Sequence, residues 1–350
     1  MFEPRTTITF KILSQQDKSI KLALKRSTPL KQLSIALSTA LAMSMSYAQT
    51  SNTQSNDNQA SKSLSVPASK ADNQTDFVQK VNNSEWKPGV EMNQEMGTKV
   101  QALLNWNQYG VGSVDGWWGK NTQKAMQAFQ KAKGITITDN LDQKTWDALQ
   151  NVDLAKKPVL ISYTLTDSDV NIKTTTIPED VEAKSKLEGL YYESVAEAMA
   201  EKFHMSMGYL KQLNPNTTFS AGESLTVYNP GKANKIAIAR VVADKSNQIL
   251  YAYDKDNQLV ASYPTTVGST ATPSPTGTHK VQTKVSDPNY TYTDADGNQT
   301  ILPPGPNNPV GRVWIGLDKP SYGIHGSPDP DRISRQASSG CIRLTNWDAL

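Results

Sequence analysis

The spacing of hydrophobic and polar positions changes several times along this 350-residue chain. A short apolar run over residues 33–45 follows a polar, basic stretch, and the run is too short to cross a bilayer comfortably. Ser46-Tyr47-Ala48 then place small residues where a signal peptidase reads them. Residues 1–48 are therefore predicted to be a secretory signal peptide cleaved after Ala48, the alternative being an uncleaved anchor.

The next segment, residues 49–87, has no hydrophobic periodicity. It is rich in Ser, Asn, Gln and Asp and almost lacks aromatic residues. Such a composition cannot bury enough apolar surface to offset the entropy lost on ordering. We therefore predict a disordered linker that tethers the folded part.

Apolar residues at helical spacing reappear between residues 88 and 152, in three segments separated by turns. Asn121 is expected to cap the second helix and Gly134 to end it. The apolar stripes of the three segments comprise Val100, Leu103, Leu104, Ala125, Ala128, Phe129, Ala132, Trp146 and Leu149. This pattern predicts a compact module of three helices.

Residues 158–230 predict a strand, two helices and a second strand. Ile161–Leu165 has strand character, and Ser194-Val-Ala-Glu197 is a capping box that begins a helix. The last strand lies within residues 222–227. His204, near the end of the first helix, is expected to be a solvated surface residue.

From residue 235 onward the hydrophobic period becomes two, which is typical of strands. Two alternating segments, residues 248–253 and 258–263, flank a turn of Asp, Lys, Asp and Asn and predict a hairpin. The Pro-rich stretch 302–309 is predicted to be a loop, because proline cannot donate in the middle of a sheet.

Charge and cysteine content restrict the possible functions. The net charge is +3, but residues 1–48 carry seven Lys or Arg against two Asp or Glu. The remaining 29 basic and 31 acidic residues give about −2, so no nucleic-acid partner is expected. With three scattered His and one Cys, neither an internal disulfide nor a metal site is expected, and no cofactor is implied.

The candidate chemistry lies near the end of the chain. Cys341 is the only cysteine, and His325 precedes it by sixteen positions in a His-Gly pair. A thiol becomes a nucleophile as the thiolate, and a nearby imidazole is the usual group that takes its proton. The alternative, a buried and inert cysteine, is disfavoured by the flanking glycine and the histidine.

The order His325, then Ser338-Ser339-Gly340-Cys341-Ile342-Arg343, resembles the catalytic motif of the YkuD family of L,D-transpeptidases. Ser339 stands where that family often has a second His. Residues 272–277 and 308–317 resemble the family too, so that the likeness extends over residues 235–350. It implies a mostly β catalytic domain. That family continues beyond the position that matches Leu350, so a C-terminal truncation is expected.

Two further resemblances concern the preceding segments. Residues 88–152 resemble a small three-helix peptidoglycan-binding domain, in part through Asp115-Gly-Trp-Trp-Gly119. For Trp117 and Trp118, core packing and ligand binding are both open. Residues 158–230 resemble an α+β LysM domain, although the segment 170–189 is longer than that family has. The fold class predicted for the whole chain is therefore multidomain.

The resemblance implies roles for the site residues. Cys341 would be the nucleophile, His325 the base, and the backbone carbonyl of Gly326 the group that orients the imidazole. Backbone amides near Ser339, Gly340 and Cys341 would stabilise the oxyanion. Arg343 would bind a substrate carboxylate, the alternative being a structural salt bridge. Tyr322 and Trp314 are candidate pocket residues, for which core packing is the alternative.

The implied reaction is acyl transfer on peptidoglycan tetrapeptide stems in the periplasm, as part of cell wall biogenesis. The acceptor could be a neighbouring stem, giving a 3-3 cross-link, a free D-amino acid, a lipoprotein lysine or water. Carbapenems are the implied inhibitors. The competing hypotheses are a related cysteine hydrolase of the wall and a wall-binding protein without catalysis.

Overall fold

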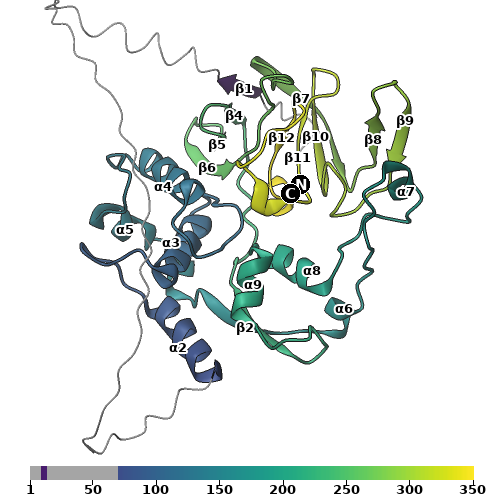
Figure 1. Ribbon diagram of the computed structural model, residues 1–350. Coiled ribbons are helices and arrows are strands. Elements are labelled where there is room, and N and C mark those ends of the chain that lie inside the picture. The colour runs from purple at the N-terminus through teal and green to yellow at the C-terminus, as the bar shows by residue number, and fades with distance from the viewer. Residues whose placement is uncertain (1–8, 14–69) are drawn as a thin grey trace, which may run out of the picture.

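The computed structural model describes residues 9–13 and 70–350, which form two packed modules below a large β-sheet domain (Figure 1). The helical module has the three predicted helices, followed by a 3-10 turn. Its elements are α3 (Gln94–Trp106), α4 (Lys120–Ala132), α5 (Gln143–Leu149) and η1 (Asp153–Lys156). Gly134 has φ +64°, as expected after a helix end. The predicted cap at Asn121 is wrong, because α4 already begins at Lys120 behind Gly119.

The prediction of a disordered linker is wrong over part of its length. Residues 49–69 lie outside the described residues, but α2 (Lys70–Asn83) is a helix that packs on α3. Phe77, Val78 and Val81 give it an apolar stripe, and Val81 is fully buried. The Asn82 side chain accepts hydrogen bonds at 2.8 Å from two backbone amides at the start of the middle module, which spans residues 158–230. These partners, distant in sequence, offset the entropy cost of ordering a polar segment.

The middle module has the predicted order of strand, two helices and strand. β2 (Leu160–Thr164) pairs antiparallel with β3 (Ser224–Tyr228), and α8 (Val195–Lys202) and α9 (Met207–Leu213) lie between them in sequence. Ser194 caps α8 by accepting from the Glu197 amide. Two short helices, α6 (Asp167–Val170) and α7 (Val181–Ser185), precede α8.

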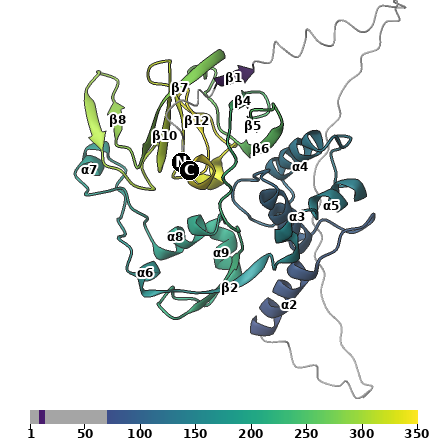
Figure 2. The ribbon, with the colours of Figure 1, turned by 180° about the vertical axis from the view of Figure 1, so that it is seen from behind.

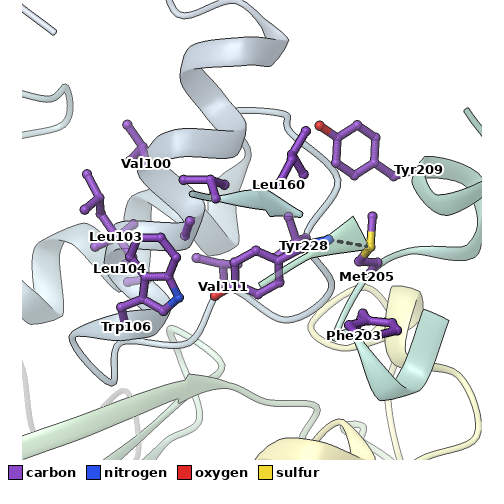
Figure 3. Packing of buried hydrophobic residues seen from close by; sticks show 14 of the residues in the cluster. Val100, Leu103, Leu104, Trp106, Val111, Leu160, Phe203, Met205, Tyr209 and Tyr228 are labelled. Carbon is purple, nitrogen blue, oxygen red and sulfur yellow. Dashed lines mark hydrogen bonds between the residues drawn. The ribbon is translucent and has the colours of Figure 1, made fainter. Parts of the chain in front are cut away.

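The helical and middle modules share one hydrophobic core (Figure 3). Trp106 stacks on Tyr228 with ring centroids 6.4 Å apart, and its indole donates to the Asn229 carbonyl at 2.8 Å. The Tyr209 hydroxyl contacts the Thr98 hydroxyl at 2.6 Å, linking α9 to α3. The two modules therefore form one packed unit.

The sheet domain is mostly β, as predicted. Its eight-stranded sheet has the order β12-β11-β10-β7-β1-β4-β5-β6, and β8 and β9 form a separate hairpin. The bounds are β4 (Arg240–Asp244), β5 (Ile249–Tyr253), β6 (Leu259–Pro264), β7 (Gly277–Ser286), β8 (Tyr290–Thr293), β9 (Gln299–Leu302), β10 (Val313–Leu317), β11 (Gly323–His325), η2 (Pro330–Arg332), β12 (Ile342–Arg343) and α10 (Asn346–Ala349). The predicted hairpin is β5–β6, and the Pro-rich loop follows β9.

Strand β1 (Thr9–Leu13) lies inside the segment predicted to be a signal peptide. It pairs in parallel with β4, from Thr9 opposite Arg240 to Leu13 opposite Asp244, and antiparallel with β7 on its other side. The rest of the predicted signal, with the cleavage site after Ala48, lies outside the described residues. Cleavage there would remove a strand from the interior of the sheet.

Both modules contact the sheet domain, as the two opposite views agree (Figures 1 and 2). α4 packs beside β6, and residues 108–110 pair with Ser262 through backbone hydrogen bonds of 2.7 and 3.1 Å. This pairing covers a sheet edge that would otherwise be open. On the other side α7 packs against β9. Within the described ranges no helix is long and apolar enough to span a membrane.

Candidate active site

Strands β11 and β12 bring the candidate nucleophile and base together. They pair in parallel, with Ile324 opposite Ile342 and His325 opposite Arg343. Cys341 immediately precedes β12, and residues two apart on a strand point to the same face. Cys341, Arg343 and His325 therefore lie on one face of the sheet, with the thiol diagonal to the imidazole.

Cys341 is partly buried in this arrangement. Burial raises the pKa of its thiol, while a hydrogen bond from the Gly323 backbone and the charge of Arg343 lower it. Sγ contacts the Ser321 carbonyl at 3.6 Å, and among the described residues no hydrogen bond joins Sγ to His325. Hydrogen bonds between catalytic groups are often long in unliganded sites and shorten when substrate binds.

His325 is buried, with only 3% of its surface exposed. Burial lowers its pKa to about 4, although the hydrogen bond with the Gly326 carbonyl opposes this shift. Nδ1 lies 2.6 Å from that carbonyl oxygen, which can only accept. Nδ1 therefore carries the proton, and Nε2 is left with a lone pair. The imidazole is neutral near pH 7 and can act as a base.

The turn before Cys341 depends on Gly340, whose φ is +115°. Few residues other than glycine adopt this backbone conformation. The Gly340 amide donates to the Ser338 hydroxyl at 3.2 Å, and that hydroxyl donates to the Cys341 carbonyl. The Gly340 amide is thus engaged in the turn rather than free for an oxyanion. Ser339 is exposed, so its side chain is accessible from solvent.

Arg343 has no salt bridge within the described part of the chain. Its Nε is buried and has no hydrogen-bond partner. A buried donor without a partner costs free energy, so an anion that binds here would gain a strong hydrogen bond. The structural salt bridge considered for Arg343 is therefore absent, and a carboxylate site is favoured.

Both candidate aromatic residues line the site. Trp314 lies opposite His325 in the β10–β11 pairing and stacks on its ring, with centroids 5.7 Å apart. The Tyr322 ring lies against Gly340, where an added Cβ would be 2.9 Å from Cε1. Both side chains are only partly buried. Tyr322 also packs against the hydrophobic core of the sheet domain, so it has a structural part as well as a place beside the site.

The other two histidines lie apart from this site. The His279 side chain contacts the Asp318 carboxylate at 2.9 Å. The expectation that His204 is a solvated surface residue is wrong, because it stacks on Trp347 of the sheet domain with an interplanar angle of 7°. Burial lowers the His204 pKa to about 4. No group of His, Cys, Asp and Glu side chains that could bind a metal ion is found in residues 9–13 or 70–350.

Comparisons with known proteins concern the sheet domain first. The model of the YkuD L,D-transpeptidase catalytic domain matches residues 238–350. The YkuD protein of Bacillus licheniformis, named as an L,D-transpeptidase, is 32% identical over 158 residues, which cover 44% of this chain and 83% of that protein. The chain belongs to the YkuD family of L,D-transpeptidases. Strand β11 with His325, and Cys341 immediately before β12, lie within the residues that match the catalytic domain.

Other YkuD-family proteins match over a similar part of the chain. YbiS of Escherichia coli, also named as an L,D-transpeptidase, is 27% identical over 43% of this chain and 54% of its own length. Among solved structures, a cysteine-to-serine mutant of the Enterococcus faecium L,D-transpeptidase is 22% identical, covering 37% of this chain and 50% of that one, with a TM-score of 0.26. The chain thus spans about half the length of that solved structure.

The helical module has its own match. A peptidoglycan binding domain model covers residues 95–149, which include α4, α5 and all of α3 except its first residue. Trp117 is 59% exposed, whereas Trp118 packs against the core. Of the two alternatives considered for these tryptophans, core packing therefore applies to Trp118, while Trp117 is accessible to a ligand.

Proposed function

We propose that this protein transfers acyl groups of peptidoglycan tetrapeptide stems through a thioester on Cys341. The observation that carries the proposal is one strand pair that places Cys341, a neutral His325 and the unpaired Arg343 on the same face. These groups supply a nucleophile, a base and a carboxylate site. A stem peptide offers an amide carbonyl next to a terminal carboxylate.

In the first step His325 Nε2 takes the thiol proton and Sγ attacks the carbonyl carbon of the third stem residue, a diamino acid. The carbon–nitrogen bond to the terminal D-alanine breaks, and the imidazolium returns its proton to the departing amine. In the second step an acceptor amine attacks the thioester and gives a proton to His325. The new amide forms as the sulfur leaves and recovers a proton.

The acceptor determines the outcome. A diaminopimelate amine of a neighbouring stem gives a 3-3 cross-link, a free D-amino acid exchanges the terminal residue, and a lipoprotein lysine attaches that lipoprotein to the wall. Water gives an L,D-carboxypeptidase. Trp314 stacks on His325 and Tyr322 lies against Gly340, and we expect these two rings to limit the access of water and so to favour amine acceptors.

The modules ahead of the sheet domain are proposed to hold the enzyme on the wall. A cleft of about 770 Å³ lies among the helical module, the middle module and the sheet domain, and Trp117, Asp115, Ser206 and Arg335 line it. An exposed indole beside donors and acceptors suits a sugar ring, so we place the glycan strand here. The LysM-like identity of the middle module belongs to the same proposal. Tethering raises the effective concentration of stems at Cys341.

Export to the periplasm by the N-terminal segment completes the proposal, since stem peptides are found there. The mass of the exported protein tests the predicted cleavage after Ala48. A product that begins at Gln49 supports it, and a product that retains β1 contradicts it.

The reaction is tested with a purified tetrapeptide stem, analysed by liquid chromatography and mass spectrometry. Released D-alanine together with a stem dimer, or with an exchanged D-amino acid, supports transpeptidation, and the Cys341→Ala variant should give neither. Tripeptide alone, with amine acceptors in excess, would replace the transferase with a hydrolase. A folded protein that leaves the stem intact would contradict both.

A further inference from the structure

His325 is held by a group of contacts that extends from the sheet domain into the middle module. Its first member is Asn346, which is fully buried at the start of α10. Asn346 Oδ1 accepts from the Arg312 amide at 3.0 Å. A Cβ added at Gly326 would lie 2.2 Å from the same oxygen, so the carboxamide packs directly against Gly326. Asn346 thus fixes the residue whose carbonyl orients His325.

The second member is Glu201, near the end of α8 in the middle module. Asn346 Nδ2 donates to Glu201 Oε2 at 2.9 Å and to the Pro306 carbonyl at 3.2 Å. The Tyr192 hydroxyl donates to Glu201 Oε1 at 2.9 Å. Each carboxylate oxygen therefore has a partner, one from each domain.

The surrounding interface is built to keep Glu201 in place. The Leu190 amide donates to the Pro304 carbonyl, and the Asn307 amide donates to the Leu190 carbonyl, both at 2.9 Å. These bonds join the middle module to the Pro-rich loop by backbone contacts. The charged groups that face Glu201 are Glu197, on its own helix, and Arg312, whose guanidinium pairs with Asp287.

We propose that Glu201 of the middle module is a positioning residue for the transpeptidase reaction, acting through Asn346 and the Gly326 carbonyl on His325. The middle module then has a part in catalysis in addition to any contact with the wall. This inference rests on the proposed acyl transfer at Cys341, and it assigns no contact between Glu201 and the substrate.

The physical consequence is a loss of orientation rather than of binding. Without an acceptor at Glu201, the Asn346 carboxamide loses one of its two Nδ2 hydrogen bonds and is held less firmly, by the Pro306 carbonyl and the Arg312 amide alone. Rotation would move Oδ1 away from the Arg312 amide and release Gly326. A misplacement of about 1 Å at a catalytic group can cost on the order of 100-fold in rate. The limiting rate of acylation should fall, and the half-saturating concentration should not.

The experiment measures acylation of Cys341 by a carbapenem, as the limiting rate and the half-saturating concentration, in the full chain. Glu201→Leu removes the acceptor and should lower the limiting rate by about 10- to 100-fold. Glu201→Gln keeps an acceptor oxygen and should recover the rate to within about threefold of the unaltered protein. The half-saturating concentration should stay within about twofold in both variants, because neither touches the ligand.

Glu197→Leu is the matched control. Glu197 lies one helical turn earlier and accepts from the Asn307 side chain at 2.8 Å, but it does not contact Asn346. The control should keep the acylation rate while losing an interdomain hydrogen bond. Equal losses of rate in Glu197→Leu and Glu201→Leu, or an unchanged rate in Glu201→Leu, would overturn the proposal.

The experiment distinguishes a failure of the proposed function from a failure of the inference about Glu201. If the unaltered protein is not acylated, the proposed function fails, whereas acylation that is indifferent to Glu201 defeats this inference alone. If Glu201→Leu does not fold, Tyr192→Phe is tested instead, because it removes only the hydroxyl that donates to the Glu201 carboxylate. The rate should then fall by about threefold or more, and an unchanged rate would refute the inference.

Discussion

Replacing Gly326 by alanine tests how closely His325, the proposed base, is held. The new Cβ would lie 2.2 Å from Asn346 Oδ1 and 3.3 Å from the Arg312 amide nitrogen. Ordinary contact requires at least 3.4 Å, so the first contact is about 1.2 Å too short. Either Asn346 or the Gly326 peptide must move by that amount. Asn346 is held by two further hydrogen bonds, so we expect the Gly326 peptide to share the movement.

This movement should have two measurable effects. Overpacking of a buried site typically costs about 1–3 kcal/mol of folding free energy, seen as a lower Tm. The displaced carbonyl also loses its 2.6 Å contact with His325 Nδ1, so the limiting rate of Cys341 acylation should fall by about 100-fold. The assay is intact-protein mass spectrometry against time, with the Tm measured on the same sample.

Two controls distinguish the effect of the short contact with Asn346 from the effect of any glycine-to-alanine substitution. Gly208→Ala, in α9, adds a methyl group that meets no atom within 4 Å outside its chain neighbours and its own helix backbone, so it should lower neither quantity. In an Asn346→Ala background, Gly326→Ala should cost less stability than it does alone, because the short contact is gone. A Gly326→Ala variant with unchanged acylation would refute the reasoning that the carbonyl positions His325.

Four other outcomes are expected. Arg343→Lys keeps the charge but loses the planar fork, so the half-saturating stem concentration should rise about tenfold with a smaller change in limiting rate; equal affinity would remove Arg343 from the carboxylate site. Trp117→Ala should weaken sedimentation with purified peptidoglycan and leave the Tm unchanged, whereas Trp118→Ala should lower the Tm; the reverse pattern would exclude Trp117 as a contact. Burial lowers the pKa of His325 to about 4, so the base stays neutral and acylation should not fall as pH drops from 8 to 6; a fall with a midpoint near 6.5 would contradict this. Burial raises the Asp348 pKa from 3.8 to about 7, so between these two pH values the folded protein keeps a proton that the unfolded chain has lost, and its stability falls as the pH rises from 3.8 to about 7. Asp348→Asn should therefore raise the Tm more at pH 8 than at pH 5, and equal effects at the two pH values would contradict the raised pKa.

Much of the architecture was accessible from local pattern. The three helices of the helical module follow apolar positions at helical spacing, and the β5–β6 hairpin follows alternation around a turn rich in Asp. The proximity of Cys341 and His325 was expected from a thiol and an imidazole beside glycines, and the β11–β12 pairing brings them together, while their catalytic roles stay a prediction. Each of these signals lies within a short stretch of sequence, where periodicity and turn chemistry act.

The features that were missed depend on partners far away in the chain. α2 is polar except for one stripe, and its order comes from contacts with β2 and α3. β1 lies in a stretch predicted to be a signal peptide, and it is a strand because β4 and β7 flank it. Asn346 and Glu201 are 145 residues apart, and no local pattern joins them. Contacts between residues so far apart in the chain produce no hydrophobic period and no motif that a single sequence could reveal.

The most direct test of the account is the intact mass of the full chain after incubation with a carbapenem. If Cys341 is the nucleophile, the folded protein should form a single covalent adduct and the Cys341→Ala variant none, because Cys341 is the only thiol in the sequence. A folded protein without an adduct, or an adduct that survives in Cys341→Ala, would contradict the claim that Cys341 is the acyl-accepting nucleophile.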